Sequence, residues 1–343
     1  MALKLLDDRR NIVVIGTSAG GVEALSKLLG FLPAEFDAVI LVVLHVSPSA
    51  PSQLDGILAK RTSLRVRPAR DGDELQPGTV FTASADRHLM VMRDGIRLTR
   101  GPKESRSRPA VDVLFRSAAV AYGSRVIGVV LTGALDDGTA GLWAIKDHGG
   151  LAFVQDPDEA SFSSMPQSAI EQVQIDCVGT LRALADRLAT EVLAPASWKR
   201  RTDSDAERAR TEVAIALEGN GMAAGIMDLG PVSKYTCPDC HGVLVQIKEG
   251  TMVRFRCHTG HAFSPVALME EVNAEIDNGL WDAIRSVEER ILLIRQLAEM
   301  HTKVGRMANA ERFEQQAADA ESRLKALRDL VLDPGFFGHA PDE

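Results

Sequence analysis

The sequence predicts an α/β protein whose first half is a doubly wound, mainly parallel sheet with an antiparallel hairpin. Apolar runs of strand length alternate with segments of helical periodicity, which is the pattern of βαβ units. A turn signal, Arg93-Asp94-Gly95, separates two further short strand patterns and predicts the hairpin. Beyond residue 264, apolar residues recur at three- and four-residue steps, which predicts a C-terminal helical hairpin.

Each element of the first half has its own pattern. The strands expected in the core are the apolar runs 12–15, 39–44, 126–131 and 151–154, and the shorter strands are 80–82, 89–92 and 96–99. We expect the last two to extend the parallel sheet with an antiparallel pair. The helices with apolar residues on one face are 21–29, 110–121 and 180–193.

A glycine-bracketed serine follows the first strand, in Gly16-Thr17-Ser18-Ala19-Gly20-Gly21. The glycines relieve crowding at a tight turn, so the Ser18 oxygen can stand clear of the backbone as a nucleophile. The same turn could instead hold a phosphate. That alternative is weak, because the second glycine of a dinucleotide turn is replaced by serine and no P-loop lysine is present.

Two more strand ends carry residues that suit a catalytic serine. His45 follows the second core strand, and Asp136 and Asp137 follow the third. Singly, a capping histidine or turn-forming aspartates would explain them. Because parallel strands end at the same edge of a sheet, serine, histidine and aspartate at three such ends favour a catalytic site.

Residues 11–193 resemble the catalytic domain of the chemotaxis receptor methylesterases, the CheB family. The resemblance is spread over ordered blocks along this segment. These blocks are Ile15–Gly21, Leu44–Pro48, Asp71–Asp73, Leu75–Gly78, Arg108–Phe115, Leu131–Gly133, Asp137-Gly138 and Met165-Pro166.

The resemblance implies a Ser-His-Asp triad made of Ser18, His45 and Asp137, with Asp136 the near alternative for the acid. It implies hydrolysis of glutamate methyl esters on a chemoreceptor, with glutamine deamidation in some members and no cofactor for catalysis. Backbone amides of Ala19 and Ala134 are the candidate oxyanion donors. The competing function is a chemosensory adaptor that keeps the esterase fold and acts by binding partners.

The implied partner is a methylated, helical, glutamate-rich chemoreceptor. The basic segment Arg100–Arg108 reads either as a mobile loop that steers this partner or as an ordinary solvated loop. The first core strand begins by Asn11, so we expect no N-terminal phosphoacceptor domain. The enzyme is then expected either to be unrestrained or to be controlled by another protein or by the C-terminal half.

Four residues near the C-terminal third have the spacing of a zinc site. Cys237-Pro238-Asp239-Cys240 precedes Cys257-His258-Thr259-Gly260-His261, with a hairpin pattern at 243–256 between them. We predict a structural Zn²⁺ on Cys237, Cys240, Cys257 and His261, with His258 as the alternative fourth ligand. The competing interpretation is a redox pair at Cys237 and Cys240, but this interpretation gives Cys257 and His261 no role. Cys177 is expected to be a buried apolar residue.

The composition completes the predicted organisation. We expect a catalytic domain at 1–195, a linker with a short helix (205–217) at 196–232, a zinc-ribbon-like module at 233–264, a helical hairpin at 265–333 and a flexible tail at 334–343. The helices could pack internally, dock on a partner or form a homodimer.

The charge and hydropathy patterns exclude some functions. No apolar run approaches the ~20 residues of a membrane helix, and the first ten residues lack a signal sequence. The net charge of −8 argues against nucleic-acid binding, and the basic residues 199–201 fall in the expected linker. We expect a cytoplasmic protein without membrane insertion.

Overall fold

The computed structural model describes residues 9–45, 53–196, 203–333 and 335–336. The chain divides into two compact units, Met1–Leu268 and Met269–Glu343. The basic residues 199–201, the segment 46–52 after His45 and all but two residues of the predicted tail lie outside the described residues.

Seven strands form the central sheet of the first unit, and all neighbouring pairs in it are parallel. They are β1 (Ile12–Thr17), β2 (Val39–Leu44), β3 (Arg65–Pro68), β4 (Thr79–Thr82), β7 (Val126–Val130), β8 (Leu151–Gln155) and β9 (Cys177–Gly179), in the order β3-β4-β2-β1-β7-β8-β9. The order reverses between β1 and β7. Open α/β sheets hold their sites at the carboxyl ends of strands beside such a reversal.

Helices cover both faces of this sheet. One face packs against α1 (Gly21–Phe31), α2 (Leu54–Leu58) and α6 (Leu181–Glu191); the other packs against α3 (Val111–Tyr122), α4 (Thr139–Asp147) and α5 (Ser164–Gln172). Alternate strand residues serve the two faces, so Val13 faces the first core and Val14 the second. The predicted doubly wound α/β class is confirmed.

The hairpin of β5 (His88–Met92) and β6 (Gly95–Thr99) differs from the expectation. It forms its own two-stranded sheet and does not extend the parallel one. Leu89, Val91 and Ile96 are buried in the core that also contains α3, while Met90 is buried against α3 and the later helix α7. Side chains on both faces of the hairpin pack against apolar partners. This packing fixes the hairpin in place although neither of its strands pairs with the parallel sheet.

A second, antiparallel sheet follows in the same compact unit. Its strands are β10 (Val232–Thr236), β11 (Val243–Glu249), β12 (Met252–Cys257) and β13 (Ala262–Phe263). We call the preceding α/β part, residues 9–45 and 53–196, the esterase-like part, after the resemblance above. Helix α7 (Asp203–Glu218) lies between it and this second sheet, because Val213 packs with Val113 of α3 while Ile215 packs with Val245 of β11. Short 3₁₀ turns cover Gly123–Arg125 and Ile226–Asp228. We call residues 203–264, from α7 through β13 to the residue that follows it, the ribbon module.

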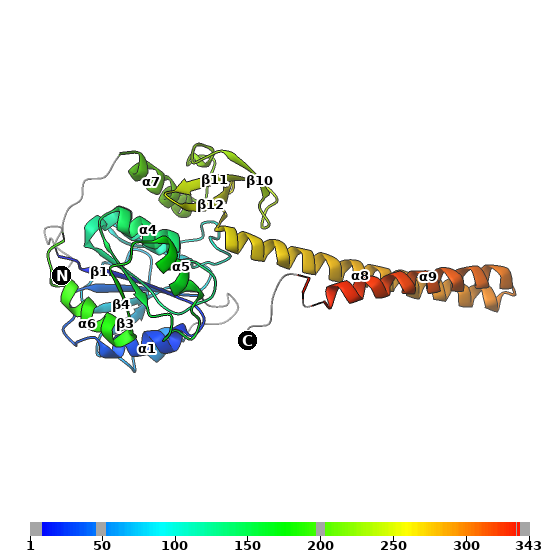
Figure 1. Cartoon of the computed structure of the whole chain (residues 1–343), viewed down its shortest axis with the longest axis horizontal. Coiled ribbons are helices and arrows are strands. Elements are labelled where there is room, and N and C mark those ends of the chain that lie inside the picture. Colours follow the sequence, from blue (N-terminus) through cyan, green and yellow to red (C-terminus); the bar gives the residue numbers. More distant parts are fainter. Residues whose placement is uncertain (1–8, 46–52, 197–202, 334, 337–343) are drawn as a thin grey trace. The chain divides into compact units, whose positions relative to one another are not determined.

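Two long helices end the described chain. Helix α8 (Pro265–Lys303) begins in the first unit and continues in the second, and α9 (Met307–Val331) returns along it after a turn at Gly305 (Figure 1). Their shared core contains Ile284, Ile291, Ala317 and Leu324. Among the described residues, no helix combines the length and the apolar character that crossing a membrane requires.

Candidate active site and metal centre

Ser18 occupies the turn between β1 and α1. Its amide donates to the Thr132 carbonyl at 3.0 Å, and the Thr17 hydroxyl donates to the same oxygen at 2.7 Å. Gly20 has a φ of 75°, which is the left-handed conformation that glycine tolerates best. The turn that carries the serine is therefore tied to the loop after β7.

The loop after β7 reaches Ser18 through Gly133. A Cβ at Gly133 would lie 2.9 Å from the Ser18 Cβ and 2.1 Å from the Met165 Sδ, so only glycine allows this approach. The same loop continues to Asp136 and Asp137, which precede α4. We call residues 131–138 the acid loop.

His45 and Asp137 are joined directly. The His45 Nε2 and the Asp137 Oδ2 are 2.7 Å apart, and Asp137 is buried while the His45 side chain keeps about a fifth of its surface exposed. A neutral His45 would donate from Nε2 to the carboxylate, which leaves Nδ1 as the acceptor for a serine proton. Among the described residues, no hydrogen bond joins Ser18 to His45; such bonds in ligand-free enzymes often form only with substrate.

The Asp137 carboxylate is also held by the start of α3. The Val111 amide donates to Oδ2 at 2.7 Å and the Asp112 amide to Oδ1 at 3.0 Å. The first amides of a helix have no partner within the helix, and the helix dipole favours an anion at this end. Asp137 is therefore a rigidly oriented anion beside the imidazole.

Asp112, in the first turn of α3, binds the start of α4 in turn. Its Oδ1 accepts hydrogen bonds from the Gly138 and Gly141 amides, at 3.0 and 2.7 Å. Burial, together with the nearby Asp137 carboxylate, raises the pKa of Asp112 to about 8. This raised pKa favours the neutral form of Asp112, which caps α4 through its Oδ1.

The other predicted residues lie at the same edge but make different contacts. Asp136 accepts a hydrogen bond from the Ser264 hydroxyl at 2.8 Å, and burial raises its pKa. Ala19 is half-buried and Ala134 is exposed. Among the described residues, neither amide has an acceptor, so both remain able to bind an oxyanion.

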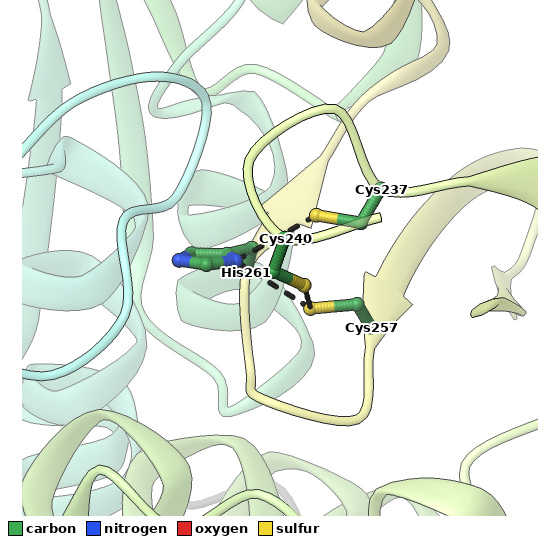
Figure 2. A group of neighbouring side chains, drawn as sticks. All are labelled: Cys237, Cys240, Cys257 and His261. Atoms are coloured by element: carbon green, nitrogen blue, oxygen red, sulfur yellow. Dashed lines mark hydrogen bonds between the residues drawn. The ribbon is translucent and has the colours of Figure 1, made fainter. Parts of the chain in front are cut away.

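The four predicted zinc ligands come together in the ribbon module. The Sγ atoms of Cys237, Cys240 and Cys257 and a ring nitrogen of His261 all lie within 4.8 Å of one another (Figure 2). Cys237 Sγ and Cys257 Sγ are each 3.6 Å from His261 Nδ1, and Cys240 Sγ is 3.6 Å from Cys257 Sγ. Tetrahedral zinc, with Zn–S of about 2.3 Å and Zn–N of about 2.0–2.1 Å, spaces its ligand atoms about 3.6–3.8 Å apart.

These distances and this donor set fit Zn²⁺. Cys237 and Cys240 come from the turn between β10 and β11, Cys257 ends β12, and His261 lies just before β13; their side chains point toward one another (Figure 2). His258, the alternative ligand, is not part of the cluster; its ring lies beside Gly242. We call residues 257–261 the second knuckle.

A buried charge cluster, which the sequence reasoning missed, joins the ribbon module to the esterase-like part. Glu212 of α7 binds Arg254 through two hydrogen bonds of 2.8 Å and also contacts Arg116 of α3 at 3.2 Å. Glu104 contacts Arg116 at 3.1 Å and Arg256 at 2.7 Å. Glu249 completes the cluster by pairing with Arg254, so three carboxylates face three guanidinium groups.

The paired arginines lower the pKa of the acid that they contact. Burial alone would raise the pKa of Glu104, but Arg116 and Arg256 outweigh it and hold the pKa at about 2. The sequence gives only a weak signal for such a cluster, because charged residues in a polar segment are usually predicted to be exposed to solvent.

The segment 100–108, read from the sequence as a steering loop or a solvated loop, also makes buried contacts that neither reading included. Glu104 is buried, and the Ser105 amide donates to the Ala262 carbonyl of β13 at 2.8 Å. At its start, the Pro102 carbonyl lies 2.9 Å from Nε2 of buried His88. Residues from the ribbon module, remote in sequence, thus supply partners for part of this segment, whereas Arg100, Lys103 and Arg106 are exposed, and the two readings of these basic side chains stay predictions.

Fold and site together define a class of protein: a doubly wound α/β domain that presents serine, histidine and aspartate from the carboxyl ends of parallel strands. The chain belongs to the CheB methylesterase family, because the family model described as "CheB methylesterase" matches residues 13–188, just over half of the chain.

Individual relatives agree with this assignment. A Methanosarcina mazei protein named protein-glutamate methylesterase/protein-glutamine glutaminase 2 is 41% identical over 187 residues, which are 52% of this chain and 51% of that protein. A Leptospira interrogans protein, named as a putative enzyme of the same kind, is 39% identical over 175 residues, 51% of this chain and 91% of the relative. The chain thus spans about half the length of the first relative.

A solved structure is also similar. The crystal structure of the Thermotoga maritima CheB methylesterase catalytic domain matches with a TM-score of 0.51 and 35% identity, covering 52% of this chain and 97% of that domain. These matches account for about half of this chain.

Proposed function

We propose that the chain is a protein-glutamate methylesterase, with the triad Ser18, His45 and Asp137. Three features support the proposal: family membership, the 2.7 Å contact between His45 and Asp137, and the approach of Gly133 to Ser18. The single observation that carries it is the His45–Asp137 contact, because it pairs an imidazole with a buried carboxylate beside the serine turn. The substrate class is a methyl-esterified glutamate on a helical, chemoreceptor-type protein.

The reaction uses the triad in two stages. His45 Nδ1 takes the proton from the Ser18 hydroxyl as its oxygen attacks the ester carbonyl carbon, and Asp137 stabilises the imidazolium. The Ala19 and Ala134 amides bind the developing oxyanion. Collapse releases methanol, which carries the proton from His45; water then hydrolyses the acyl-serine by the same steps. A glutamine side chain would release ammonia instead.

The decisive experiment measures methanol release from a methylated receptor fragment. We expect Ser18→Ala to lose roughly 10³-fold or more in turnover while keeping its fold. Ser26→Ala is the matched control, because Ser26 is a half-buried α1 residue whose hydroxyl, among the described residues, bonds only to the Val22 carbonyl of its own helix. Full activity in Ser18→Ala would refute the nucleophile. Receptor binding without methanol release by the parent would favour an adaptor.

We also propose that Cys237, Cys240, Cys257 and His261 bind a structural Zn²⁺. Four protein ligands leave no open position for a substrate or water, so the ion would stabilise the ribbon module and take no part in ester hydrolysis. The apparent binding free energy expected for such a site is on the order of 10 kcal/mol.

Metal analysis tests the zinc proposal. We expect about one zinc per chain in protein purified without chelator, and loss of zinc in Cys240→Ser. Cys177→Ser serves as the control, because Cys177 lies in β9, outside the cluster, and that variant should keep the metal. Absence of zinc from the parent protein, or equal loss in both variants, would contradict the site.

A further inference from the structure

The ribbon module contacts the esterase-like part on the side that holds the triad acid. Two contacts matter most, and both lie within the compact unit of residues 1–268. One joins Ser264 to the acid loop. The other joins Arg256 to the buried charge cluster.

Ser264 uses its hydroxyl twice. It donates to the Asp136 Oδ1 at 2.8 Å and accepts from the Ala267 amide at 3.0 Å, so it caps the start of α8 and binds the acid loop at once. Asp136 is the neighbour of Asp137 in the chain. A shift of Ser264 would therefore pull on the residue next to the triad acid.

Arg256 connects the second knuckle with α3. It is fully buried and precedes the ligand Cys257; its Nη1 donates to the Gly260 carbonyl within the knuckle at 2.8 Å. Its Nη2 contacts Glu104 at 2.7 Å and Glu212 at 2.9 Å.

Both acids bound by Arg256 also bind Arg116 of α3. The first two amides of α3, at Val111 and Asp112, are the donors that hold Asp137. Buried contacts therefore connect the second knuckle to Arg256, Arg256 through Glu104 and Glu212 to α3, and the start of α3 to Asp137. Without Arg256, Glu104 and Glu212 would keep a buried charge with one partner fewer, which the interior tolerates poorly.

We propose that the ribbon module is a metal-dependent brace for the triad acid. Metal held by the Cys237–Cys240 turn and the second knuckle fixes Arg256 and Ser264, and these positioning residues keep α3 and the acid loop aligned so that Asp137 faces His45. The inference rests on the proposed esterase and zinc site, and it adds that metal occupancy controls turnover although the metal touches no substrate.

The first test uses the two roles of Ser264. In Ser264→Asp the carboxylate still caps α8 but repels Asp136, whereas Ser264→Thr keeps the hydroxyl. We expect Ser264→Asp to lower kcat roughly 10- to 100-fold with little change in KM, because a displaced catalytic group costs about this much. Ser264→Thr should restore most of the parental kcat. Ser286→Ala, an exposed α8 serine bonded only within its helix, is the control.

The second test removes the metal and reads the structure directly. After chelation, we expect the Val111 and Asp112 amides to exchange hydrogen at least roughly 10-fold faster, while amides of α1 and α6 on the opposite face keep their protection. Zinc addition should reverse both the exchange and the loss of turnover.

The possible outcomes distinguish failure of the proposed esterase function from failure of the proposed brace. If the parent releases no methanol, the proposed function fails, and the exchange experiment still tests the brace. If the parent is active, the brace is refuted when metal-free protein keeps both turnover and protection at Val111 and Asp112, or when Ser264→Asp keeps the parental kcat. General loss of protection on both faces would also refute it, because the metal would then stabilise the whole unit.

Discussion

At the scale of single residues, the two buried aspartates Asp112 and Asp137 lie in similar surroundings and have different tasks. Each accepts two backbone hydrogen bonds near a helix start, but only Asp137 contacts His45. Burial and the neighbouring Asp137 raise the pKa of Asp112 to about 8, which favours its neutral form at pH 7. Two carboxylates side by side therefore place a single charge beside the imidazole.

This difference predicts that replacing aspartate by asparagine changes turnover very differently at the two positions. Asp112→Asn should keep near-parental turnover, because asparagine is neutral and still offers an oxygen to the Gly138 and Gly141 amides. Asp137→Asn should lose on the order of 10⁴-fold, because an amide cannot stabilise the imidazolium. Methanol-release kinetics at pH 7 measure both. Equal losses in the two variants would show that Asp112 works as an anion.

At the scale of elements, the β5–β6 hairpin depends on a buried neutral histidine. His88 is fully buried, its Nδ1 accepts from the Ala110 amide at 3.2 Å, and its Nε2–H donates to the Pro102 carbonyl. Burial lowers the pKa of His88 below 6.5. One histidine thus connects the hairpin, the start of α3 and the segment 100–108.

The sign of the resulting pH dependence follows from linkage. Above pH 6.5 His88 is neutral in both the folded and the unfolded chain, so its contribution to stability is complete. As the pH falls from 6.5 toward the lower folded pKa, the unfolded chain binds the proton first, and His88 costs up to about 1.4 kcal/mol per pH unit.

Urea unfolding between pH 7.5 and 5 measures this effect. We expect the parent's free energy of unfolding to decrease more steeply below pH 6.5 than that of His88→Asn, which keeps a donor and an acceptor but does not titrate. Parallel curves for the two proteins would contradict a buried neutral His88.

At the scale of the whole molecule, the ribbon module belongs to the same compact unit as the esterase-like part, while residues 269–343 form a unit of their own. Helix α7 is central to this arrangement, because it contributes Val213 and Ala216 to one apolar cluster, Ile215 to another and Glu212 to the buried charges. Docking of the C-terminal helices on a partner or on a second copy stays a prediction.

Two truncations should therefore behave differently. A chain that ends shortly after Leu268 should keep its fold, because the removed residues form a separate unit. A chain that ends at Pro195 exposes Met90 and Val113 and strips Glu104 and Arg116 of partners from α7 and β12, so we expect lower stability or aggregation. Thermal unfolding compares them; equal melting temperatures would show that the ribbon module adds nothing to the esterase-like part.

Local patterns were sufficient for much of this protein. The strand ends that carry Ser18, His45 and Asp137, the parallel sheet, the two long helices and the spacing of the four candidate metal ligands can all be inferred from the sequence, because they depend on periodicity and on short turns. Segments with weak patterns were missed, such as β3, whose residues are half-buried or exposed, and β9, which has only three residues.

What only the tertiary structure decided is which distant groups meet. The separate packing of the β5–β6 hairpin, the contact of Ser264 with Asp136 and the burial of Glu104, Glu212 and Arg256 depend on partners up to 152 residues apart in the chain. A charged side chain is stable in the interior only beside its counter-charge, and no local pattern shows where that partner will lie.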